Sequence, residues 1–392
     1  MPGPVVIAGG GLAALRTAEN LRRFGHTGPI TIVGEEPWLP YDRPPLSKAA
    51  LLEADGTDGP APLRSGDHLA GQGIEVVRGV RATRLDVAGR RLHLSDGAAL
   101  PYEHLVIATG VRARTLPAPH PALPVLTLRT WEDSRRTRDG ILAAGHVTVA
   151  GGGFLGLEIA SAARRLGRDV TVVEAGPAPL WALGPTVAER VAELHRRNGV
   201  TLLTGRRVVA AEPDAGRFAV TLDDGAVLTT DVMVNAVGGV PNVEWLAGSG
   251  LDAAQGVPCD ETGATPAEGV HAVGDVAAIA GRGRTEHWNH AVATAVVVAH
   301  NIARPDAPPR RLADLPYFWS DQHGSKLQCL GSPDPSDELR VLRDDEQGFL
   351  AVHLRDGIVT GVAALDMPLA LNRCRPHVGK AFDATALGAL VA

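Results

Sequence analysis

The chain is 392 residues long, with 45% hydrophobic residues, 21% charged residues and a formal net charge of −6 at pH 7. This length exceeds what one hydrophobic core usually supports, so two or three domains are expected. The composition is ordinary for a soluble globular protein, and the negative charge argues against a general nucleic-acid binder.

Three cysteines, Cys259, Cys329 and Cys374, lie far apart in the sequence. Their spacing gives neither a Cys-x-x-Cys redox pair nor a metal-ligand pattern, so no metal site is expected. The longest apolar run, Ala291–Ala299, is too short to cross a bilayer. No signal-peptide pattern precedes the first predicted strand, and these features predict a cytoplasmic protein without a membrane partner.

The first segment, residues 5–14, joins a short apolar run to three glycines and the start of an amphipathic pattern. This order predicts a buried strand, a tight turn and a helix. Gly9, Gly11 and Ala14 occupy the three small positions of a dinucleotide-binding turn, where a pyrophosphate lies at the helix N-terminus. The next apolar run ends at Glu35, the acid that a ribose hydroxyl pair requires.

A proline-rich segment over residues 37–48 follows this unit. Prolines at this density predict an extended loop and no helix, and the loop would present Arg43 and Lys48 as fixed cations. Further on, residues 105–110 predict a buried strand that runs into the turn Thr109–Gly110. Small residues in such a turn let the backbone lie against a ligand or another segment.

The strand–turn–helix–strand pattern recurs later in the chain. Residues 147–150 predict a strand and Gly151–Gly156 a second glycine-rich turn. After the helix that follows, the next predicted strand again ends in an acid, Glu174. A duplicated motif with an acid in each copy is a strong signal. It predicts two dinucleotide-binding units with one dinucleotide in each.

Two more glycine-containing turns follow the second unit. Gly238 lies in the turn that closes this unit, and Gly274–Asp275 ends a predicted strand that begins at Gly269. A carboxylate at Asp275 suits the polyol of a flavin nucleotide. Aspartate before a helix is also a good N-cap, and both interpretations stay open.

The composition changes after residue 308. Aromatic residues, which are 4% of the chain, concentrate in residues 316–322. Short strands are then predicted over 339–342, 348–354 and 358–365, before a final helix. This pattern predicts a small third domain of the α+β class.

The predicted fold class is therefore α/β, with two three-layer Rossmann-like domains and a small C-terminal α+β domain. The first dinucleotide-binding domain is predicted over residues 1–112 and 243–309, the second over residues 113–242, and the C-terminal domain over residues 310–392.

Four longer motifs are more specific than either glycine turn: Arg43-Pro-Pro-Leu-Ser-Lys48, Gly151-Gly-Gly-Phe-Leu-Gly-Leu-Glu158, Glu286-His-Trp288 and Phe318-Trp-Ser-Asp-Gln322. Through them the chain resembles the FAD-dependent NAD(P)H ferredoxin reductases of bacterial P450 and Rieske dioxygenase systems. The resemblance covers essentially the whole length and is weaker beyond Gly331. It implies that the first domain binds FAD and the second a nicotinamide dinucleotide.

The resemblance also implies roles for individual residues. Lys48 and Glu158 match a charged pair beside the flavin N5, where hydride arrives, although an ordinary interdomain ion pair is the alternative interpretation. Residues expected to contact FAD are Gly9, Gly11, Ala13, Ala14, Glu35, Arg43, Lys48, Ala82, Thr109, Gly110, Arg129, Gly274, Asp275 and Trp288. Residues expected at the nicotinamide dinucleotide are Gly151, Gly153, Phe154, Leu155, Gly156, Glu174 and Gly238.

The position of Glu174 matches the residue that reads the adenosine ribose. A carboxylate accepts hydrogen bonds from two ribose hydroxyls and repels a 2′-phosphate, so NADH is predicted as the cofactor over NADPH. Arg168, Arg206 and Arg207 are near enough in the sequence to leave NADPH open.

The absence of a cysteine pair at either glycine-rich turn indicates how electrons leave. They are predicted to pass singly to a small iron–sulfur ferredoxin, which supplies a P450 or Rieske oxygenase. An acidic ferredoxin favours a basic docking face. The candidates in the last domain are Arg310, Arg311, Arg373, Arg375 and Lys380, although a solvated surface side chain is the simpler interpretation of each one.

Two other functions stay open from the sequence. One is a rubredoxin reductase or the flavoprotein of a nitrite reductase. The other is a redox sensor that holds FAD and NADH in a long-lived charge-transfer complex. The protein is expected to be a monomer or a homodimer.

Overall fold

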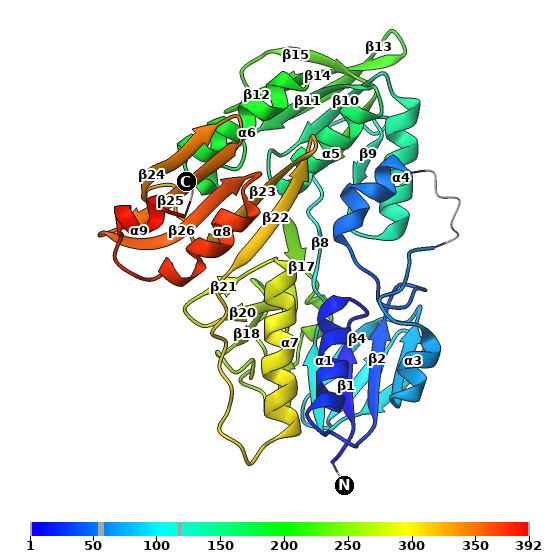
Figure 1. The fold of residues 1–392 in the computed structure, drawn as a ribbon. Helices are drawn as coiled ribbons and strands as arrows, with labels where there is room; N and C mark the ends of the chain where they lie inside the picture. Colours follow the sequence, from blue (N-terminus) through cyan, green and yellow to red (C-terminus); the bar gives the residue numbers. More distant parts are fainter. Residues whose placement is uncertain (1, 54–58, 117–118, 391–392) are drawn as a thin grey trace. The chain divides into compact units, whose positions relative to one another are not determined.

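The computed structural model describes residues 2–53, 59–116 and 119–390. The chain divides into two compact units, which can be followed by residue number in Figure 1. Unit 1 consists of Met1–Asp42, Thr57–Arg112 and Val240–Asp314. Unit 2 consists of Arg43–Gly56, Ala113–Gly239 and Leu315–Ala392. The boundaries of the three predicted domains stay a prediction.

Unit 1 is built on a five-stranded parallel sheet in the order β19–β7–β1–β2–β3. The strands are β1 (Val5–Ala8), β2 (Ile30–Gly34), β3 (Ile74–Arg78), β7 (His104–Ile107) and β19 (Val270–Ala272). The central strand, β1, is buried along its whole length, as its apolar sequence predicts.

The alternating side chains of β1 divide unit 1 into layers. Val5 and Ile7 pack in one cluster with α1 (Leu12–Arg23) and α7 (Trp288–Ala303), which lie side by side in Figure 1. The short helix α3 (Gly66–Gly71) contributes to the same cluster. Val6 and Ala8 point to the opposite layer.

The opposite layer of unit 1 consists of two small three-stranded sheets. They are β4 (Ala82–Asp86), β5 (Arg91–Leu94) and β6 (Ala99–Pro101), and β18 (Val257–Cys259), β20 (Ala277–Ile279) and β21 (Gly283–Arg284). Leucines on β4 and β5 pack beneath the central strands in one continuous core. The three-layer arrangement predicted for this part of the chain is confirmed.

Unit 2 repeats the parallel sheet in the order β12–β11–β10–β16–β9. The strands are β9 (Val125–Thr127), β10 (His146–Ala150), β11 (Asp169–Glu174), β12 (Val200–Thr204) and β16 (Val232–Asn235). Helices α4 (Trp131–Ala143), α5 (Phe154–Arg165) and α6 (Pro185–Arg197) pack on these strands. Strands β13 (Val208–Asp214), β14 (Arg217–Leu222) and β15 (Val227–Thr230) form a meander whose apolar side chains pack against the sheet.

The C-terminal part of unit 2 is an antiparallel sheet in the order β22–β23–β26–β25–β24. The strands are β22 (Tyr317–Gln322), β23 (Ser325–Gly331), β24 (Glu338–Asp345), β25 (Gly348–Arg355) and β26 (Ile358–Leu365). One face packs on α5 and α6, and the other on α8 (Pro368–Cys374) and α9 (Ala384–Gly388). The predicted α+β fold of this region is confirmed.

One expectation about the proline-rich segment is wrong. The segment contains a 3-10 helix, Pro44–Ser47, followed directly by the short helix α2 (Ala49–Leu52). Pro44 and Pro45 occupy the first two helical positions, where the missing N–H has no intrahelical partner to lose and the fixed φ suits a helix. The prolines therefore start this helix instead of preventing it.

Asp231 joins three segments of unit 2. Its carboxylate accepts hydrogen bonds from the backbone amides of Gly145 and His146, at 2.8 and 2.7 Å, and from Arg217 Nε at 2.7 Å. Burial alone would raise the pKa of this carboxyl, but the hydrogen bonds from Arg217, His146 and Gly145 lower it below its ordinary value.

We expect Asp231→Asn to lower the free energy of unfolding at pH 7 by about 1–2 kcal/mol, because an amide replaces a charged acceptor. A carboxyl with a lowered folded-state pKa stabilises the fold above its unfolded pKa and loses that contribution as the pH falls through the folded pKa. The difference from the wild type should therefore shrink below about pH 4. Urea denaturation across pH measures it. Asp169→Asn, at an exposed residue paired with Arg164, is the matched control and should change stability by less than ~0.5 kcal/mol.

Candidate functional sites

The first candidate site of unit 1 lies where four parallel strands end. Gly9 follows β1, Glu35 follows β2, Thr109 lies two residues beyond β7, and Gly274–Asp275 lies just beyond β19. In open α/β sheets, ligands bind outside the carboxyl ends of the strands. The structure therefore collects residues from three widely separated parts of the sequence at one edge of the sheet.

The glycines of the first turn are required for different reasons. Gly9 has a φ of +129°, and a Cβ there would lie 2.1 Å from the carbonyl oxygen of Ala108. Gly11 has an extended backbone, with a φ of −97°, and a Cβ there would meet no described atom within 4 Å beyond its chain neighbours. The fold itself therefore explains Gly9, whereas Gly11 keeps open a space at the start of α1 where a pyrophosphate fits.

The turn at Gly274 approaches the same glycine-rich turn. Its φ is +71°, and a Cβ there would lie 2.9 Å from the Cβ of Ala13. Asp275 lies in a 3-10 turn, Gly274–Val276, and not at a helix start, because α7 begins at Trp288 with His287 as its N-cap. The N-cap interpretation of Asp275 is wrong. Asp275 directly follows Gly274, whose turn approaches Ala13 in the glycine-rich turn.

The second candidate site repeats this geometry in unit 2. Gly151 has a φ of +108°, and a Cβ there would lie 2.4 Å from the carbonyl oxygen of Ala236, at the end of β16. A Cβ at Gly156 would lie 2.0 Å from the carbonyl oxygen of Gly151, so α5 packs directly on the turn. Gly153 is extended, with a φ of −77°, and a Cβ there meets no described atom within 4 Å. Gly151 and Gly153 thus have the same roles as Gly9 and Gly11 in the first copy, whereas Ala14 occupies the position that corresponds to Gly156.

The two acids at the strand ends differ in their partners. Glu174 accepts hydrogen bonds from the backbone amides of Gly152, at 2.5 Å, and Gly176, at 2.6 Å. The side chain of Glu35 is 72% exposed and lies 3.9 Å from Arg81. The carboxylate of Glu174 therefore fixes the second turn, while that of Glu35 faces solvent.

The third candidate site surrounds Glu158 on α5. Lys48 Nζ lies 2.9 Å from Glu158 Oε1, and the hydroxyls of Ser47 and Ser320 donate to its two oxygens at 2.5 and 2.6 Å. The side chain of Glu158 is only 8% exposed and that of Lys48 22%. A buried carboxylate is stable when its partners are paired in this way, and removing one partner leaves an uncompensated charge. The predicted Lys48–Glu158 pair is formed.

The remaining predicted residues divide between the two units. Ala82 begins β4 and Trp288 begins α7, and Trp288 Nε1 donates to Asp42 at 2.8 Å, all within unit 1. Arg43 donates to the carbonyl oxygen of Arg129 at 2.5 Å within unit 2. Ala13, Ala14 and Gly110 belong to unit 1, and Phe154, Leu155 and Gly238 to unit 2. Whether each contacts a cofactor stays a prediction.

Sequence reasoning assigned no role to Ser47, Ser320 or Gln322, which surround or support Glu158. A signal was present in β22, where the buried residues Ser320 and Gln322 lie two positions apart and therefore on one face. Polar residues on the buried face of a strand indicate a polar partner on the element that packs against it.

The three cysteines are buried, and none is paired. Burial raises the pKa of the Cys259 and Cys329 thiols to about 12 and that of Cys374 to about 11. Thiols with such pKa values stay protonated at neutral pH and are poor nucleophiles. The prediction that no thiol pair takes part in the chemistry agrees with this environment.

The described part of the chain holds neither a metal-binding cluster nor a helix that could span a membrane. No group of three or more His, Cys, Asp or Glu side chains there has an arrangement that would hold a metal ion. Among the helices of the same residues, none is long and apolar enough to span a bilayer.

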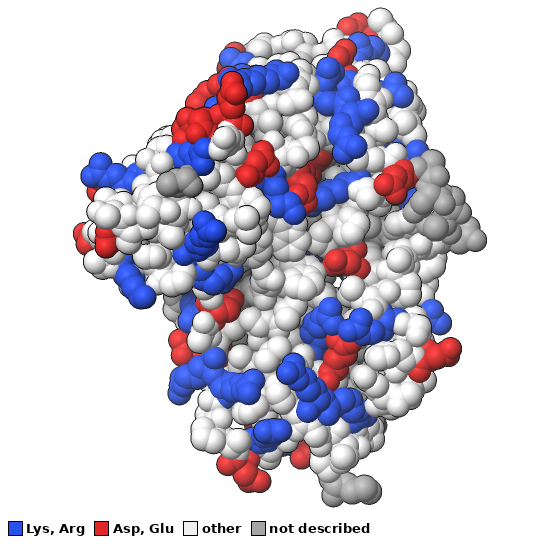
Figure 2. Space-filling view, in the orientation of Figure 1, with Lys and Arg blue, Asp and Glu red and all other residues white. Residues whose placement is uncertain are grey.

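The predicted docking residues are divided between the two units. Arg310 and Arg311 belong to unit 1, whereas Arg373, Arg375 and Lys380 belong to unit 2. Their place on one docking face stays a prediction. On the face shown in Figure 2, basic side chains lie in separate groups with acidic side chains among them.

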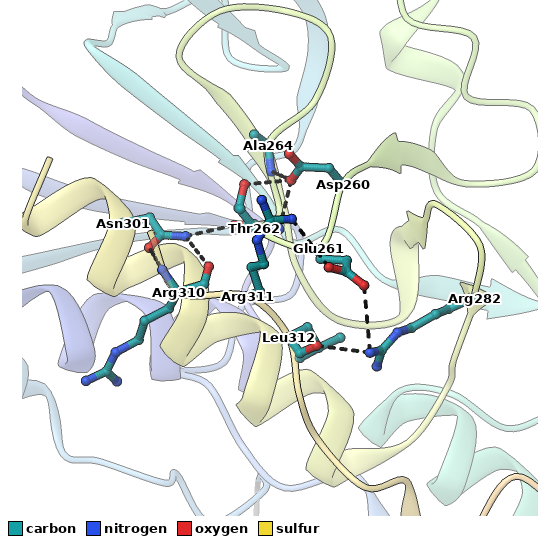
Figure 3. A network of polar contacts seen from close by, with 9 residues as sticks. All are labelled: Asp260, Glu261, Thr262, Ala264, Arg282, Asn301, Arg310, Arg311 and Leu312. Carbon is teal, nitrogen blue, oxygen red and sulfur yellow. Dashed lines mark hydrogen bonds and ion pairs between the residues drawn. The ribbon is translucent and has the colours of Figure 1, made fainter. Parts of the chain in front are cut away.

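Figure 3 shows why the segment around Arg310 stays with unit 1. The backbone of Arg310 exchanges two hydrogen bonds with the amide of Asn301 on α7, at 2.8 and 2.9 Å. The Arg311 side chain lies 3.5 Å from Glu261, and Arg282 donates to the carbonyl oxygen of Leu312 at 3.0 Å. These contacts hold the segment against α7 and the loop after β18.

Comparison with known proteins agrees with this architecture. A sequence model of the pyridine nucleotide-disulphide oxidoreductases matches residues 3–295, and one of the reductase C-terminal domain matches residues 317–387. The chain therefore belongs to the pyridine nucleotide-disulphide oxidoreductase family. Members of this family bind FAD and NAD(P)H, which the two glycine-rich sites fit.

Particular relatives place the chain more narrowly. It is 36% identical over 373 residues to rhodocoxin reductase of Rhodococcus erythropolis, covering 93% of this chain and 86% of that protein. It is 37% identical over 381 residues to the ferredoxin–NAD(+) reductase component of the anthranilate 1,2-dioxygenase system of Burkholderia cepacia, covering 95% and 93%. The crystal structure of the ferredoxin reductase for the CYP199A2 system of Rhodopseudomonas palustris superposes with a TM-score of 0.92 at 32% identity, covering 97% and 96%. The predicted resemblance to the oxygenase-coupled ferredoxin reductases is confirmed.

The contrast between the two kinds of glycine gives a direct test. We expect Gly153→Ala to change the free energy of unfolding of the apoprotein by less than ~1 kcal/mol, because the new methyl group meets open space. The same variant should weaken NADH binding at least about tenfold, because the methyl group would occupy the space predicted for the pyrophosphate.

Gly151→Ala is the matched comparison in the same turn. It should destabilise the apoprotein by more than ~2 kcal/mol, because its Cβ meets a backbone carbonyl and its φ is left-handed. Urea denaturation and calorimetric titration with NADH measure both effects. Unchanged NADH affinity in Gly153→Ala would show that this turn does not hold the dinucleotide.

Proposed function

We propose that the protein takes hydride from NADH onto FAD and passes electrons singly to a small iron–sulfur ferredoxin, which supplies a P450 or Rieske-type oxygenase. The observation that carries this proposal is the pair of equivalent glycine-rich sites, one in each unit, in a chain whose three cysteines are buried, unpaired thiols. The name of the Burkholderia cepacia relative includes a ferredoxin and a dioxygenase system, which supports the nature of the partner.

The proposed reaction balances without any protein thiol. One NADH and two oxidised ferredoxins give NAD⁺, two reduced ferredoxins and one proton. When bound, FAD supplies a group that accepts two electrons as hydride and releases them one at a time. The protein's own part is to bind the two cofactors, orient them, and stabilise the charge that develops during hydride transfer.

Lys48 is the proposed electrostatic group at the hydride-transfer step. Its ammonium contacts Glu158 Oε1 at 2.9 Å and the carbonyl oxygen of Pro44 at 3.4 Å. Among the contacts of described residues, these use two of the three N–H donors of the ammonium. A cation fixed in this way stabilises negative charge that develops during the reaction without having to reorganise.

The FAD site is proposed to be the edge of the unit 1 sheet. The amides at the start of α1 would hold the pyrophosphate, and the carboxylates of Glu35 and Asp275 would accept hydrogen bonds from hydroxyl groups. Proposed contacts from Arg43, Ala82, Arg129 and Trp288 rest on the family resemblance, which matches these residues to positions that contact FAD.

The nicotinamide dinucleotide is proposed to be NADH. Glu174 lies at the end of β11, where a ribose hydroxyl pair would meet its carboxylate. Arg168 donates to the carbonyl oxygen of Leu142, and Arg206 forms an ion pair with Asp224 at 2.8 Å. Arg207 lies 3.9 Å from Asp223, so all three arginines that would favour a 2′-phosphate have partners of their own.

We expect Glu174→Ala to lower the ratio of kcat/KM for NADH to that for NADPH by at least about tenfold, because the repulsion of the 2′-phosphate and the ribose hydrogen bonds are both lost. Glu35→Ala, at the equivalent acid of the first copy, is the matched control. It should lower FAD content or affinity and leave the NADH to NADPH ratio unchanged. Equal use of both nucleotides by the wild-type protein would contradict the proposed preference.

The proposed activity is tested by anaerobic titration of the flavin-loaded protein with NADH, followed by addition of a ferredoxin and cytochrome c. Bleaching of the flavin by one equivalent of NADH and ferredoxin-dependent reduction of cytochrome c are the expected results. A long-lived charge-transfer band without ferredoxin reduction would instead support the redox sensor. Reduction of rubredoxin in place of every ferredoxin tested would support a rubredoxin reductase.

A further inference from the structure

A line of hydrogen-bonded side chains runs from Glu158 through β22 to the end of α6. Ser320 Oγ lies 2.6 Å from Glu158 Oε1, and Gln322 Nε2 lies 2.9 Å from Ser320 Oγ. Gln322 Oε1 lies 2.9 Å from His195 Nε2, and His195 Nδ1 lies 3.1 Å from His323 Nε2. Ser320 and His195 are completely buried and Gln322 is 2% exposed. All of these residues belong to unit 2.

The chemistry of the groups fixes the direction of every hydrogen bond in the line. An ionised carboxylate only accepts, so Ser320 donates its single proton to Glu158, and its oxygen accepts from the amide nitrogen of Gln322. The carbonyl oxygen of Gln322 then accepts from Nε2–H of His195. In a neutral imidazole the other nitrogen is an acceptor, so Nε2–H of His323 donates to Nδ1 of His195. Every donor therefore points toward Glu158.

The two histidines are neutral in this arrangement. Burial lowers the pKa of His195 to about 4, although the hydrogen bond with Gln322 opposes this shift. Burial, His195 and the nearby guanidinium groups of Arg164 and Arg165 lower the pKa of His323 to about 4. A neutral pair is also what the one-directional hydrogen bonding requires.

The backbone anchors this line to the helix that carries Glu158. His323 lies in the hairpin turn after β22, with a φ of +53°, and its amide donates to Ser161 Oγ at 2.7 Å. Ser161 and Glu158 are three residues apart on α5 and lie on the same face. Strand β22 is therefore attached to α5 at two points, through Ser320 and through the turn.

We propose that Ser320, Gln322 and His195 are positioning residues, which hold Glu158 as a fully hydrogen-bonded carboxylate and thereby fix the Lys48 ammonium for hydride transfer. This inference rests on the proposed role of Lys48 in that step. These hydrogen-bonded side chains orient Glu158 and do not conduct protons. The amide nitrogen of Gln322 has no lone pair available to accept a proton.

The test uses Gln322→Glu, which keeps the size of the side chain and removes the amide donor. A carboxylate at this position accepts from Ser320 in competition with Glu158 and stabilises a charged His195. We expect the limiting rate of flavin reduction at saturating NADH to fall about 10- to 100-fold, as for other residues that orient a reacting group, with little change in NADH affinity. Anaerobic stopped-flow absorbance at several NADH concentrations separates the two quantities.

A second measurement determines the tautomer and the pKa of His195 and does not require NADH. In the wild-type protein, NMR of labelled histidine should show His195 as the neutral Nε2–H tautomer throughout pH 6–8. In Gln322→Glu the pKa of His195 should rise by at least about one unit, because a carboxylate replaces an amide as its partner. The His195 signal is assigned by its absence in a His195→Gln sample.

Gln328→Glu is the matched control. Gln328 is a buried glutamine of the same sheet, 4% exposed, whose amide donates to the hydroxyl of Tyr317 at 2.6 Å and not to the line. It should leave the limiting rate and the His195 titration as in the wild type. If Gln322→Glu does not fold, Ser320→Ala and Ser320→Thr replace it, since only the second keeps the hydroxyl and should retain rapid flavin reduction.

Wild-type limiting rates in folded Gln322→Glu or Ser320→Ala would overturn the proposal, as would equal slowing in Gln328→Glu. A wild-type protein that NADH does not reduce would contradict the proposed function. The NMR experiment would still test the direction of the hydrogen bonds between His323 and Glu158. His195 in the Nδ1–H tautomer would show that these bonds have a different direction from the one proposed.

Discussion

Both dinucleotide sites depend on one steric constraint, which is the contact between a glycine-rich turn and the carbonyl oxygen at the end of a neighbouring parallel strand. At Gly9 and at Gly151 this oxygen occupies the place where a Cβ would lie. The chain can leave the central strand and enter a helix there only because these residues have no side chain. The amides at the start of that helix are thereby directed to the open edge of the sheet, where a phosphate group is predicted to bind.

The second turn also places the proposed chemistry. Helix α5 begins directly after Gly153, and Glu158 lies in its second turn. The helix packs against the 3-10 helix Pro44–Ser47 and against β22. The carboxylate meets Lys48 and Ser47 from one distant segment and Ser320 from another. A buried charge requires pairing and hydrogen bonds, which the lysine and the two serines supply together.

The C-terminal sheet has more than one role in this arrangement. Its apolar face packs on α5 and α6, while Ser320 and Gln322 on the same region of β22 supply polar contacts. The sheet therefore contributes to the surroundings of Glu158 as well as carrying its own core with α8 and α9. This gives a physical reason for a reductase C-terminal domain that follows the two nucleotide-binding parts.

The sequence by itself determined the local elements and the duplicated sites, because glycine spacing, apolar runs and acids at strand ends are local patterns. It also identified the Lys48–Glu158 pair through its motifs, although these residues are 110 positions apart. Tertiary structure alone decided that Ser47, Ser320, Gln322 and His195 support this pair, since the spacing of Ser320 and Gln322 in the sequence does not say which distant side chain they meet. It likewise decided that Pro44 starts a helix and that Arg310 packs with α7, because both outcomes depend on which neighbours satisfy the backbone.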